Sequence, residues 1–143
     1  MKEGQKILLE INQVYSKFPT VGECISYLEE VRWKGKPICP YCNSTRFTPL
    51  NQERRYHCHR CNTSFSVTTR TVFHRTHLPL QKWFLAISLL LGERRPLSAR
   101  QLSRALKVNK NTAWLITSRI DRALNEAKQR DLLQALLKAL LNL

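Results

Sequence analysis

Apolar residues recur three or four positions apart near the start of the chain and predict two helices there. The first covers residues 3–17, with its apolar side formed by Ile7, Leu8, Ile11, Val14 and Tyr15. The second opens at a capping box, in which the hydroxyl of Thr20 and the carboxylate of Glu23 satisfy free amides of the first turn. It ends before Gly35, and its inward positions are Cys24, Leu28 and Val31. Both helices are expected to act as packing elements.

Apolar and polar positions alternate between residues 38 and 73, which is the period of a β-strand. Strands are predicted over 46–50, 54–58 and 64–68, with residues 51–53 as the turn between the first two. The small core of this segment is predicted to consist of Phe47, Tyr56, Phe65 and Val67. A β module of this size buries too little surface to fold by itself, so it needs a further source of stability.

Helical spacing returns in residues 79–125 and predicts three more helices. The first begins near Pro79, with an apolar stripe formed by Leu80, Phe84, Ile87 and Leu91. Ser98 and Gln101 form a second capping box, and Asn109 is a good N-cap for the last helix. The buried face of that helix is predicted to be Ala113, Ile116, Ile120 and Leu124. A short helix, a tight turn and a longer helix are typical of a helix-turn-helix.

Leucines repeat along residues 126–143 and form the broad apolar face of one more amphipathic helix. They are Leu132, Leu133, Leu136, Leu137, Leu140 and Leu141. Two arrangements account for this face equally well. The helix either folds back onto the helix-turn-helix core or forms the interface of a homodimer.

Four of the five cysteines form two Cys-x-x-Cys pairs separated by fifteen residues. The pairs are Cys39 with Cys42 and Cys58 with Cys61, and each can place two thiolates on one tight turn. If the intervening strands bring the turns face to face, four thiolates close a tetrahedron around Zn²⁺. Such a site contributes folding free energy on the order of 10 kcal/mol and leaves no open position for a catalytic water. The sequence therefore predicts a structural zinc site in preference to two disulfides or a redox pair.

Three other residues of metal-binding type need a separate interpretation. His57 and His59 flank Cys58 and are candidates for a mixed cysteine–histidine site, although four cysteines already complete the tetrahedron. Cys24 falls outside the motif, on the predicted second helix, and is expected to be a small, buried apolar residue.

Taken together, these patterns predict an α+β chain that is mostly helical. A helical pair at residues 1–36 precedes a small β zinc ribbon at 37–77. A three-helix helix-turn-helix domain at 78–125 and a leucine-rich helix at 126–143 follow. The ribbon is thus inserted between two helical groups.

The chain is strongly basic, with 24 lysines and arginines, 10 acidic residues and a formal net charge of +14. Residues 38–77 hold six basic and one acidic residue, and residues 78–125 hold nine and two. Such a balance favours a polyanionic partner, nucleic acid before an anionic membrane. The longest apolar stretch, 83–91, is far shorter than the ~20 residues of a membrane span, and no signal peptide is recognised. We expect a cytoplasmic, nucleoid-associated protein with reduced thiols.

The helix-turn-helix pattern also assigns candidate DNA contacts, because the last helix of such a motif points its N-terminal residues at base edges in the major groove. The base-reading candidates are Lys110, Asn111 and Trp114. Asparagine bonds an adenine edge and lysine reaches guanine, whereas Trp114 is equally suited to packing between helices. The phosphate-contacting candidates are Arg100, Arg104, Lys107, Arg119 and Arg122. Lys107 stands in the turn, where a left-handed backbone costs about 1 kcal/mol.

Several motifs, in order and spacing, resemble the N-terminal region of bacterial zinc-ribbon insertion-sequence transposases. They are Phe18-Pro19, the stretch from Tyr27 to Trp33, Cys39-Pro40-Tyr41-Cys42, the stretch from Tyr56 to Val67, Thr71-Val72-Phe73, the stretch from Leu78 to Phe84, and Lys110-Asn111-Thr112-Ala113-Trp114. The resemblance covers residues 18–125. It implies that the ribbon and the helix-turn-helix bind the terminal inverted repeats of the element. In such transposases a ribonuclease-H-like domain with an acidic triad and Mg²⁺ then cuts and joins DNA.

The chain departs from that plan where the catalytic domain is expected to begin. Asp121, Glu126 and Asp131 lie within eleven residues of helical sequence, with no strands to bring carboxylates together around metal ions. We therefore expect a transposase-derived protein that binds duplex DNA at terminal-inverted-repeat-like sites and is not an enzyme. The alternative is a protein-interaction adaptor or transcriptional regulator. It would dock a full-length transposase or RNA polymerase through the ribbon or the C-terminal helix.

Overall fold

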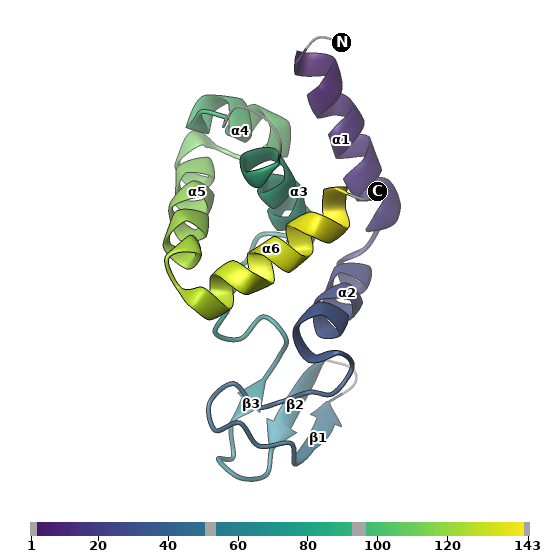
Figure 1. Ribbon diagram of the computed structural model, residues 1–143, viewed down its shortest axis with the longest axis vertical. Helices are drawn as coiled ribbons and strands as arrows, with labels where there is room; N and C mark the ends of the chain where they lie inside the picture. Colours follow the sequence, from purple (N-terminus) through teal and green to yellow (C-terminus); the bar gives the residue numbers. More distant parts are fainter. Residues whose placement is uncertain (1–2, 51–53, 93–96, 142–143) are drawn as a thin grey trace.

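The computed structural model describes residues 3–50, 54–92 and 97–141. Helices fill one end of the molecule and a small sheet forms the other (Figure 1). In chain order the elements are α1 (Glu3–Lys17), α2 (Val21–Trp33), β1 (Phe47–Leu50), β2 (Arg55–Cys58), β3 (Ser64–Phe65), α3 (Leu80–Leu91), α4 (Ala99–Leu106), α5 (Lys110–Leu124) and α6 (Ala127–Leu141). The predicted class, a mostly helical α+β chain, is confirmed. The sheet lies between two groups of helices in the order of the sequence, although it forms one end of the folded molecule.

Helix α3 is the centre of the helical part. All of its residues from 83 to 89 are buried, and α1, α2, α4, α5 and α6 pack against it. The sequence pattern predicted one apolar stripe on this helix, but the structure buries the middle of the helix on every side. The reason is that helices from both ends of the chain enclose it. Leu91, the last residue of the predicted stripe, is only half-buried.

The three predicted N-cap residues cap their helices, although at Thr20 only the threonine half of the predicted capping box is seen. Oγ1 of Thr20 accepts the backbone N–H of Glu23 at 3.3 Å, at the start of α2. Ser98 and Gln101 form a complete reciprocal capping box at α4. Asn109 caps α5, and its side chain accepts an amide of the first turn at 2.7 Å. These bonds satisfy donors that the helices themselves leave unpaired.

The sheet is antiparallel, in the order β1-β2-β3. Tyr56 of the central strand pairs with Phe65 of β3. The third strand ends at Phe65 and not at residue 68 as predicted, because the hydroxyl of Thr69 accepts the amide of Ser66 at 2.9 Å and closes a turn. The turn predicted at 51–53 lies outside the described residues.

The core of the sheet includes one residue that the sequence pattern did not assign to it. Phe65 and Val67 are buried as predicted, whereas Phe47 and Tyr56 are half-buried. Trp33, the last residue of α2, places its ring 5.8 Å from the rings of both Tyr56 and Phe65 in edge-on contacts. Such aromatic contacts join the sheet to α2. The ribbon and the N-terminal helical pair therefore share a core.

Helix α6 folds back on its own chain. Its buried residues are Leu132, Leu133, Leu136 and Leu140, and the helix packs against α2, α3 and α5. Of the two arrangements weighed for these leucines, the structure shows the folded-back one. The four buried leucines are consequently covered within the chain and are not free to form the homodimer interface considered from the sequence.

A segment without regular structure, residues 66–79, links the sheet to α3 and is called the connector below. Side chains from three helices bind its backbone. Nη1 of Arg32 donates to the carbonyl of Val67 at 2.8 Å, and Nη2 of Arg119 donates to that of His74 at 2.6 Å. The side chain of Gln129 both accepts an amide and donates to a carbonyl of the connector, at 3.2 and 3.0 Å. These bonds fix the ribbon relative to the helices.

Candidate metal centre and nucleic-acid interface

The two Cys-x-x-Cys pairs lie on two turns with the same backbone hydrogen bonds. In the first turn, the amide of Cys39 donates to the carbonyl of Ser44 at 3.0 Å, and the amide of Asn43 donates to the carbonyl of Cys39 at 2.8 Å. In the second, the corresponding pairs join Cys58 to Thr63 and Asn62 to Cys58, both at 3.0 Å. The site is therefore built twice from one local pattern.

An asparagine after each pair makes this turn possible. Asn43 has φ 62° and Asn62 has φ 57°, and asparagine tolerates this left-handed backbone better than other side-chain-bearing residues. Our reading of the sequence missed both residues. The signal was present, because Cys-Pro-Tyr-Cys-Asn-Ser and Cys-His-Arg-Cys-Asn-Thr repeat the same six-residue pattern.

The four sulfur atoms have the spacing of a tetrahedral metal site. Sγ of Cys39 lies 3.7 Å from Sγ of Cys61, and Sγ of Cys42 lies 3.5 Å from Sγ of Cys58. All four lie within 4.8 Å of one another. A tetrahedron with Zn–S bonds of about 2.3 Å has S···S edges of about 3.8 Å, whereas a disulfide requires about 2.05 Å. The distances fit zinc and exclude the disulfide alternative for this conformation.

The surroundings of the thiols favour the thiolate form at two of the four positions. Backbone N–H groups of Cys61 and Arg60 lower the pKa of Cys58 to about 6, and the hydroxyl of Thr63 lowers the pKa of Cys61. Burial raises the pKa of Cys42 to about 12. A bound divalent cation supplies positive charge that offsets this burial, because a coordinated thiol ionises readily.

Both histidines beside Cys58 point to partners outside the sulfur cluster. Nε2 of His57 lies 3.3 Å from Oδ1 of Asn62, and Nε2 of His59 lies 2.7 Å from Oγ1 of Thr48. Neither belongs to the group of ligand atoms that the described residues bring together. The metal site consists of the four predicted cysteines. Cys24 is fully buried in α2, as the sequence predicted.

The start of α5 presents the three predicted base-reading residues to solvent. Lys110 and Asn111 are exposed, and Trp114 is 64% exposed. The alternative that Trp114 packs between helices is therefore wrong. Sequence reasoning missed Leu115, which is 51% exposed next to it. A large apolar side chain on the outer face of a predicted recognition helix was the signal for it.

The predicted phosphate contacts divide into two groups. Arg100, Arg104, Lys107 and Arg122 are exposed. Arg119 differs, because its guanidinium is held inside by the carbonyl of His74 and lies 5.7 Å from the centre of the Trp83 ring. Arg119 is half-buried against the connector, so it has a structural contact, and its phosphate contact stays a prediction. Lys107 ends α4 with φ 57°, the left-handed turn considered from the sequence.

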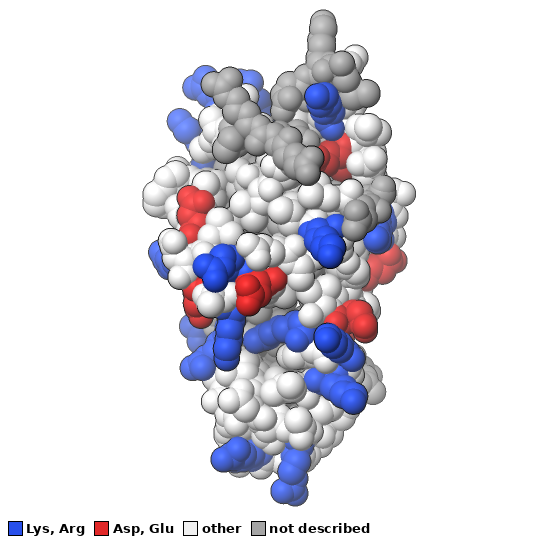
Figure 2. Space-filling view, viewed as in Figure 1, with Lys and Arg blue, Asp and Glu red and all other residues white. Residues whose placement is uncertain are grey.

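Basic side chains spread over both parts of the molecule. Figure 2 shows Lys and Arg on the helical body and at the tip of the sheet, with the acidic side chains of this face near its middle. No helix among the described residues is long and apolar enough to cross a membrane. Among the described residues, the four cysteines form a group that could hold a metal ion. Asp121, Glu126 and Asp131 do not form another such group.

Comparison with known proteins shows what the chain is similar to. Residues 19–64, which contain both Cys-x-x-Cys pairs, match the family model of the transposase zinc-ribbon domain. The chain is 33% identical over 111 residues to an uncharacterized protein in transposable element ISH50 of Halobacterium salinarum. The match covers 76% of this chain and 37% of that protein, so the chain spans little more than a third of its relative's length. No solved structure matches.

Proposed function

We propose that the chain binds duplex DNA sequence-specifically, at sites like the terminal inverted repeats of an insertion sequence. One observation carries this proposal more than any other. Helix α5 buries Ala113, Ile116 and Ile120 against the core and leaves Asn111 and Trp114 exposed on its other side. A helix held in this way after a tight turn is suited to insertion into a major groove.

Three exposed residues of α5 have a defined role in this proposal. The amide of Asn111 bonds the N6 and N7 groups of adenine, and Lys110 reaches the O6 and N7 acceptors of guanine. Leu115 lies four residues after Asn111, hence on the same face and about 6 Å further along the helix. Apolar side chains recognise the methyl group of thymine. We infer that the preferred site contains an A·T pair opposite each of Asn111 and Leu115.

The remaining basic residues act on the DNA backbone. Arg100, Arg104, Lys107 and Arg122 are exposed on α4, the turn and the end of α5, where they are suited to neutralising phosphates. Such contacts fix the register of the protein on the duplex and add affinity that falls with salt.

The metal has a structural role in the proposal. Four protein ligands fill a tetrahedral zinc site, so no coordination position is left for substrate. We assign the chain no strand-transfer activity of its own. The family match is to a zinc ribbon, and the acidic residues on α5 (121), before α6 (126) and on α6 (131) form no metal-ligand cluster. If the pure protein nicked repeat-ended DNA in a metal-dependent reaction, the assignment of no strand-transfer activity would be contradicted.

Random-site selection from a duplex library, with sequencing of the bound fraction, tests the proposal directly. We expect a consensus that contains A·T pairs. Asn111→Ala should weaken binding to that consensus by ~1–3 kcal/mol and reduce discrimination at one position. Asn12→Ala is the matched control, because Asn12 is exposed on α1. If the selection yields no consensus, or if Asn111→Ala and Asn12→Ala lose the same binding free energy, base reading by α5 is rejected.

A further inference from the structure

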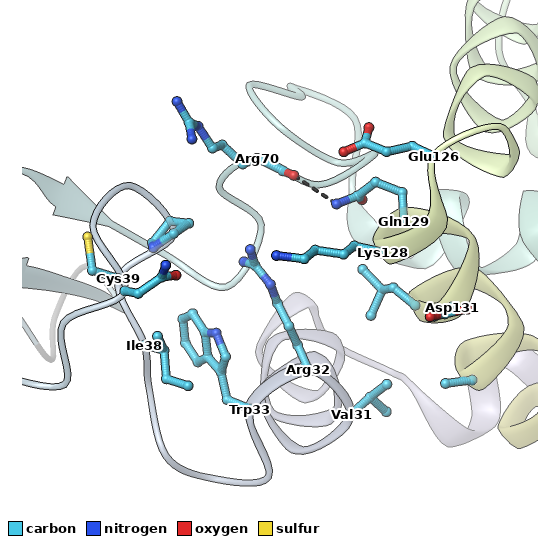
Figure 3. Close-up of a pocket in the computed structure, with 14 residues that line it drawn as sticks. Val31, Arg32, Trp33, Ile38, Cys39, Arg70, Glu126, Lys128, Gln129 and Asp131 are labelled. Carbon is cyan, nitrogen blue, oxygen red and sulfur yellow. Dashed lines mark hydrogen bonds between the residues drawn. The ribbon is translucent and has the colours of Figure 1, made fainter.

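A groove of about 570 Å³ lies between the first cysteine turn, the end of α2 and the start of α6. Trp33, Ile38 and Pro40 form one wall, and Leu132 and Ala135 of α6 form part of the other. These elements come from three distant parts of the sequence. Figure 3 shows that the labelled side chains of α2 and α6 face one another across this space.

Two cations point into the groove from opposite sides. The guanidinium of Arg32 and the ammonium of Lys128 extend toward one another (Figure 3). Arg32 is half-buried, and its contacts are the carbonyl of Val67 at 2.8 Å and the ring of Trp33 at 5.5 Å. Within the described part of the chain, its partners are thus a carbonyl and a ring and not a carboxylate. Like charges that converge without an anion between them repel.

The other charged groups of the groove are placed differently. The guanidinium of Arg70 turns away to lie 4.7 Å from the centre of the Tyr41 ring, while its carbonyl accepts Nε2 of Gln129 at 3.0 Å. Two carboxylates also line the groove and are exposed: Glu126, which directly precedes α6, and Asp131 of α6. Arg32 is half-buried and has lost part of its water shell, and this burial lowers its pKa. An anion between Arg32 and Lys128 would replace that water and remove the repulsion.

We propose that this groove is a phosphate-binding site that takes a backbone phosphate of the bound DNA, outside the base pairs read by α5. The proposal rests on the proposed function. A planar guanidinium with free N–H groups and an ammonium opposite it match the oxygens of a phosphate. The apolar wall of Trp33 and Ile38 reduces local solvent, so the charge interaction is stronger there than on an open surface.

The position of the groove explains why it is distinct from the reading surface. α6 begins directly after α5, so Lys128 lies beyond the C-terminal end of the recognition helix. Fifteen residues of α5 span about 20 Å, the length of roughly six base-pair steps. A phosphate in the groove is therefore contacted by the ribbon side of the molecule, and it extends the footprint past the pairs that Asn111 and Leu115 read.

The test compares Lys128→Gln with Lys138→Gln, a change at an exposed lysine on the same helix that does not line the groove. DNA affinity is measured over a range of salt concentrations with the selected duplex. Removing one phosphate contact should reduce the slope of log K against log salt by about 0.9 for Lys128→Gln, without changing the consensus. Lys138→Gln should leave the slope unchanged. Equal slopes for the two variants would overturn the proposal.

NMR signals of the Arg32 Nε–H group and the Trp33 indole report on the groove itself. We expect both to shift when wild-type protein binds duplex, and to shift less in Lys128→Gln. A response to inorganic phosphate but not to duplex, or to a polyglutamate peptide but not to duplex, would overturn the assignment to DNA. If no DNA binding is seen at all, the proposed function fails as well. If the protein binds DNA normally but the NMR signals of Arg32 and Trp33 do not shift, only the phosphate site in the groove is rejected.

Discussion

Arg119 of α5 donates a hydrogen bond from Nη2 to the backbone carbonyl of His74, with an N···O distance of 2.6 Å. The same guanidinium lies over the ring of Trp83 in α3. One side chain therefore joins α5, the connector and α3. The orientation of the ribbon relative to α5 depends on this contact.

Arg119→Ala should lower the free energy of unfolding by roughly 1–3 kcal/mol, because it leaves a part-buried carbonyl without its charged donor and removes a cation–π contact. Urea unfolding followed by circular dichroism measures the change. Arg122→Ala, an exposed arginine on the same helix, is the control and should change stability by less than about 0.5 kcal/mol. Equal losses for the two variants would show that Arg119 has no structural role.

Replacing thymine by uracil in the selected DNA site tests the role of Leu115. Loss of one thymine methyl should weaken wild-type binding by about 0.8 kcal/mol, a factor of about four, at one position of the site. Leu115→Ala should bind both DNAs equally. Leu8→Ala, at an exposed leucine of α1, should keep the full wild-type difference. A uracil effect that persists in Leu115→Ala would assign the methyl contact elsewhere.

Cys58→Ser should abolish stoichiometric zinc binding and unfold the ribbon, because the remaining three ligands lie on a module too small to fold without the metal. Zinc analysis of reduced, purified protein and backbone NMR of residues 38–65 measure the two effects. Cys24→Ala is the control and should retain one zinc per chain, since Cys24 lies outside the sulfur cluster. Retention of zinc by Cys58→Ser would contradict the four-cysteine site.

Substitutions of Asn62 test the turn geometry that both halves of the metal site share. Asn62→Gly should preserve zinc binding, because glycine adopts φ 57° without strain. Asn62→Val should lose about 1–2 kcal/mol, because a β-branched residue is disfavoured in the left-handed region. Competition with a chromogenic chelator gives the relative zinc affinities. Asn43 occupies the matching position, so Asn43→Val should have a similar effect.

Stability should fall as pH rises above about 9. Burial raises the pKa of Cys24 in the folded state from 9.0 to about 12, so between these values the unfolded state releases a proton that the folded state retains. Release from the unfolded state alone stabilises that state, by at most about 1.4 kcal/mol per pH unit for one proton. Chemical unfolding at pH 8, 9.5 and 10.5 measures the slope.

Cys24→Ala removes this proton and should flatten the alkaline slope. Part of the slope should remain, because burial and the neighbouring Glu29 also raise the pKa of Tyr56 to about 12. The hydroxyl of Tyr56 donates to the carboxylate of Glu29, which joins β2 to α2. An alkaline slope that is identical in wild type and Cys24→Ala would show that Cys24 is accessible in the folded protein.

Local rules in the sequence predicted most of the elements and the metal ligands. The N-cap at Thr20 and the capping box at Ser98 located two helix starts, and the Cys-x-x-Cys spacing identified all four ligands. Each of these features depends on residues close together in the chain. The asparagines after each pair were equally local but were not recognised.

Long-range packing was the part that the sequence could not decide. A period of 3.6 residues shows that α6 has an apolar face, but it does not show what covers that face. Folding back and dimerisation therefore explained the sequence equally well, and the structure shows that α6 packs on α3. The hydrogen bond from Arg119 to the connector could not be predicted for the same reason, because it also depends on long-range packing. Its partner His74 is 45 residues away, and a basic residue on a predicted recognition helix otherwise indicates a phosphate contact.

The enclosure of α3 by helices from both ends of the chain limits how this protein can be divided. A fragment reduced to the predicted 78–125 unit would strip three of the five neighbours from α3, and its aromatic and leucine side chains would face water. Under the proposed function, a change of DNA specificity would therefore have to occur on the outer surface of α5. Recombination that moved residues 78–125 alone would separate α3 from α1, α2 and α6, which cover it.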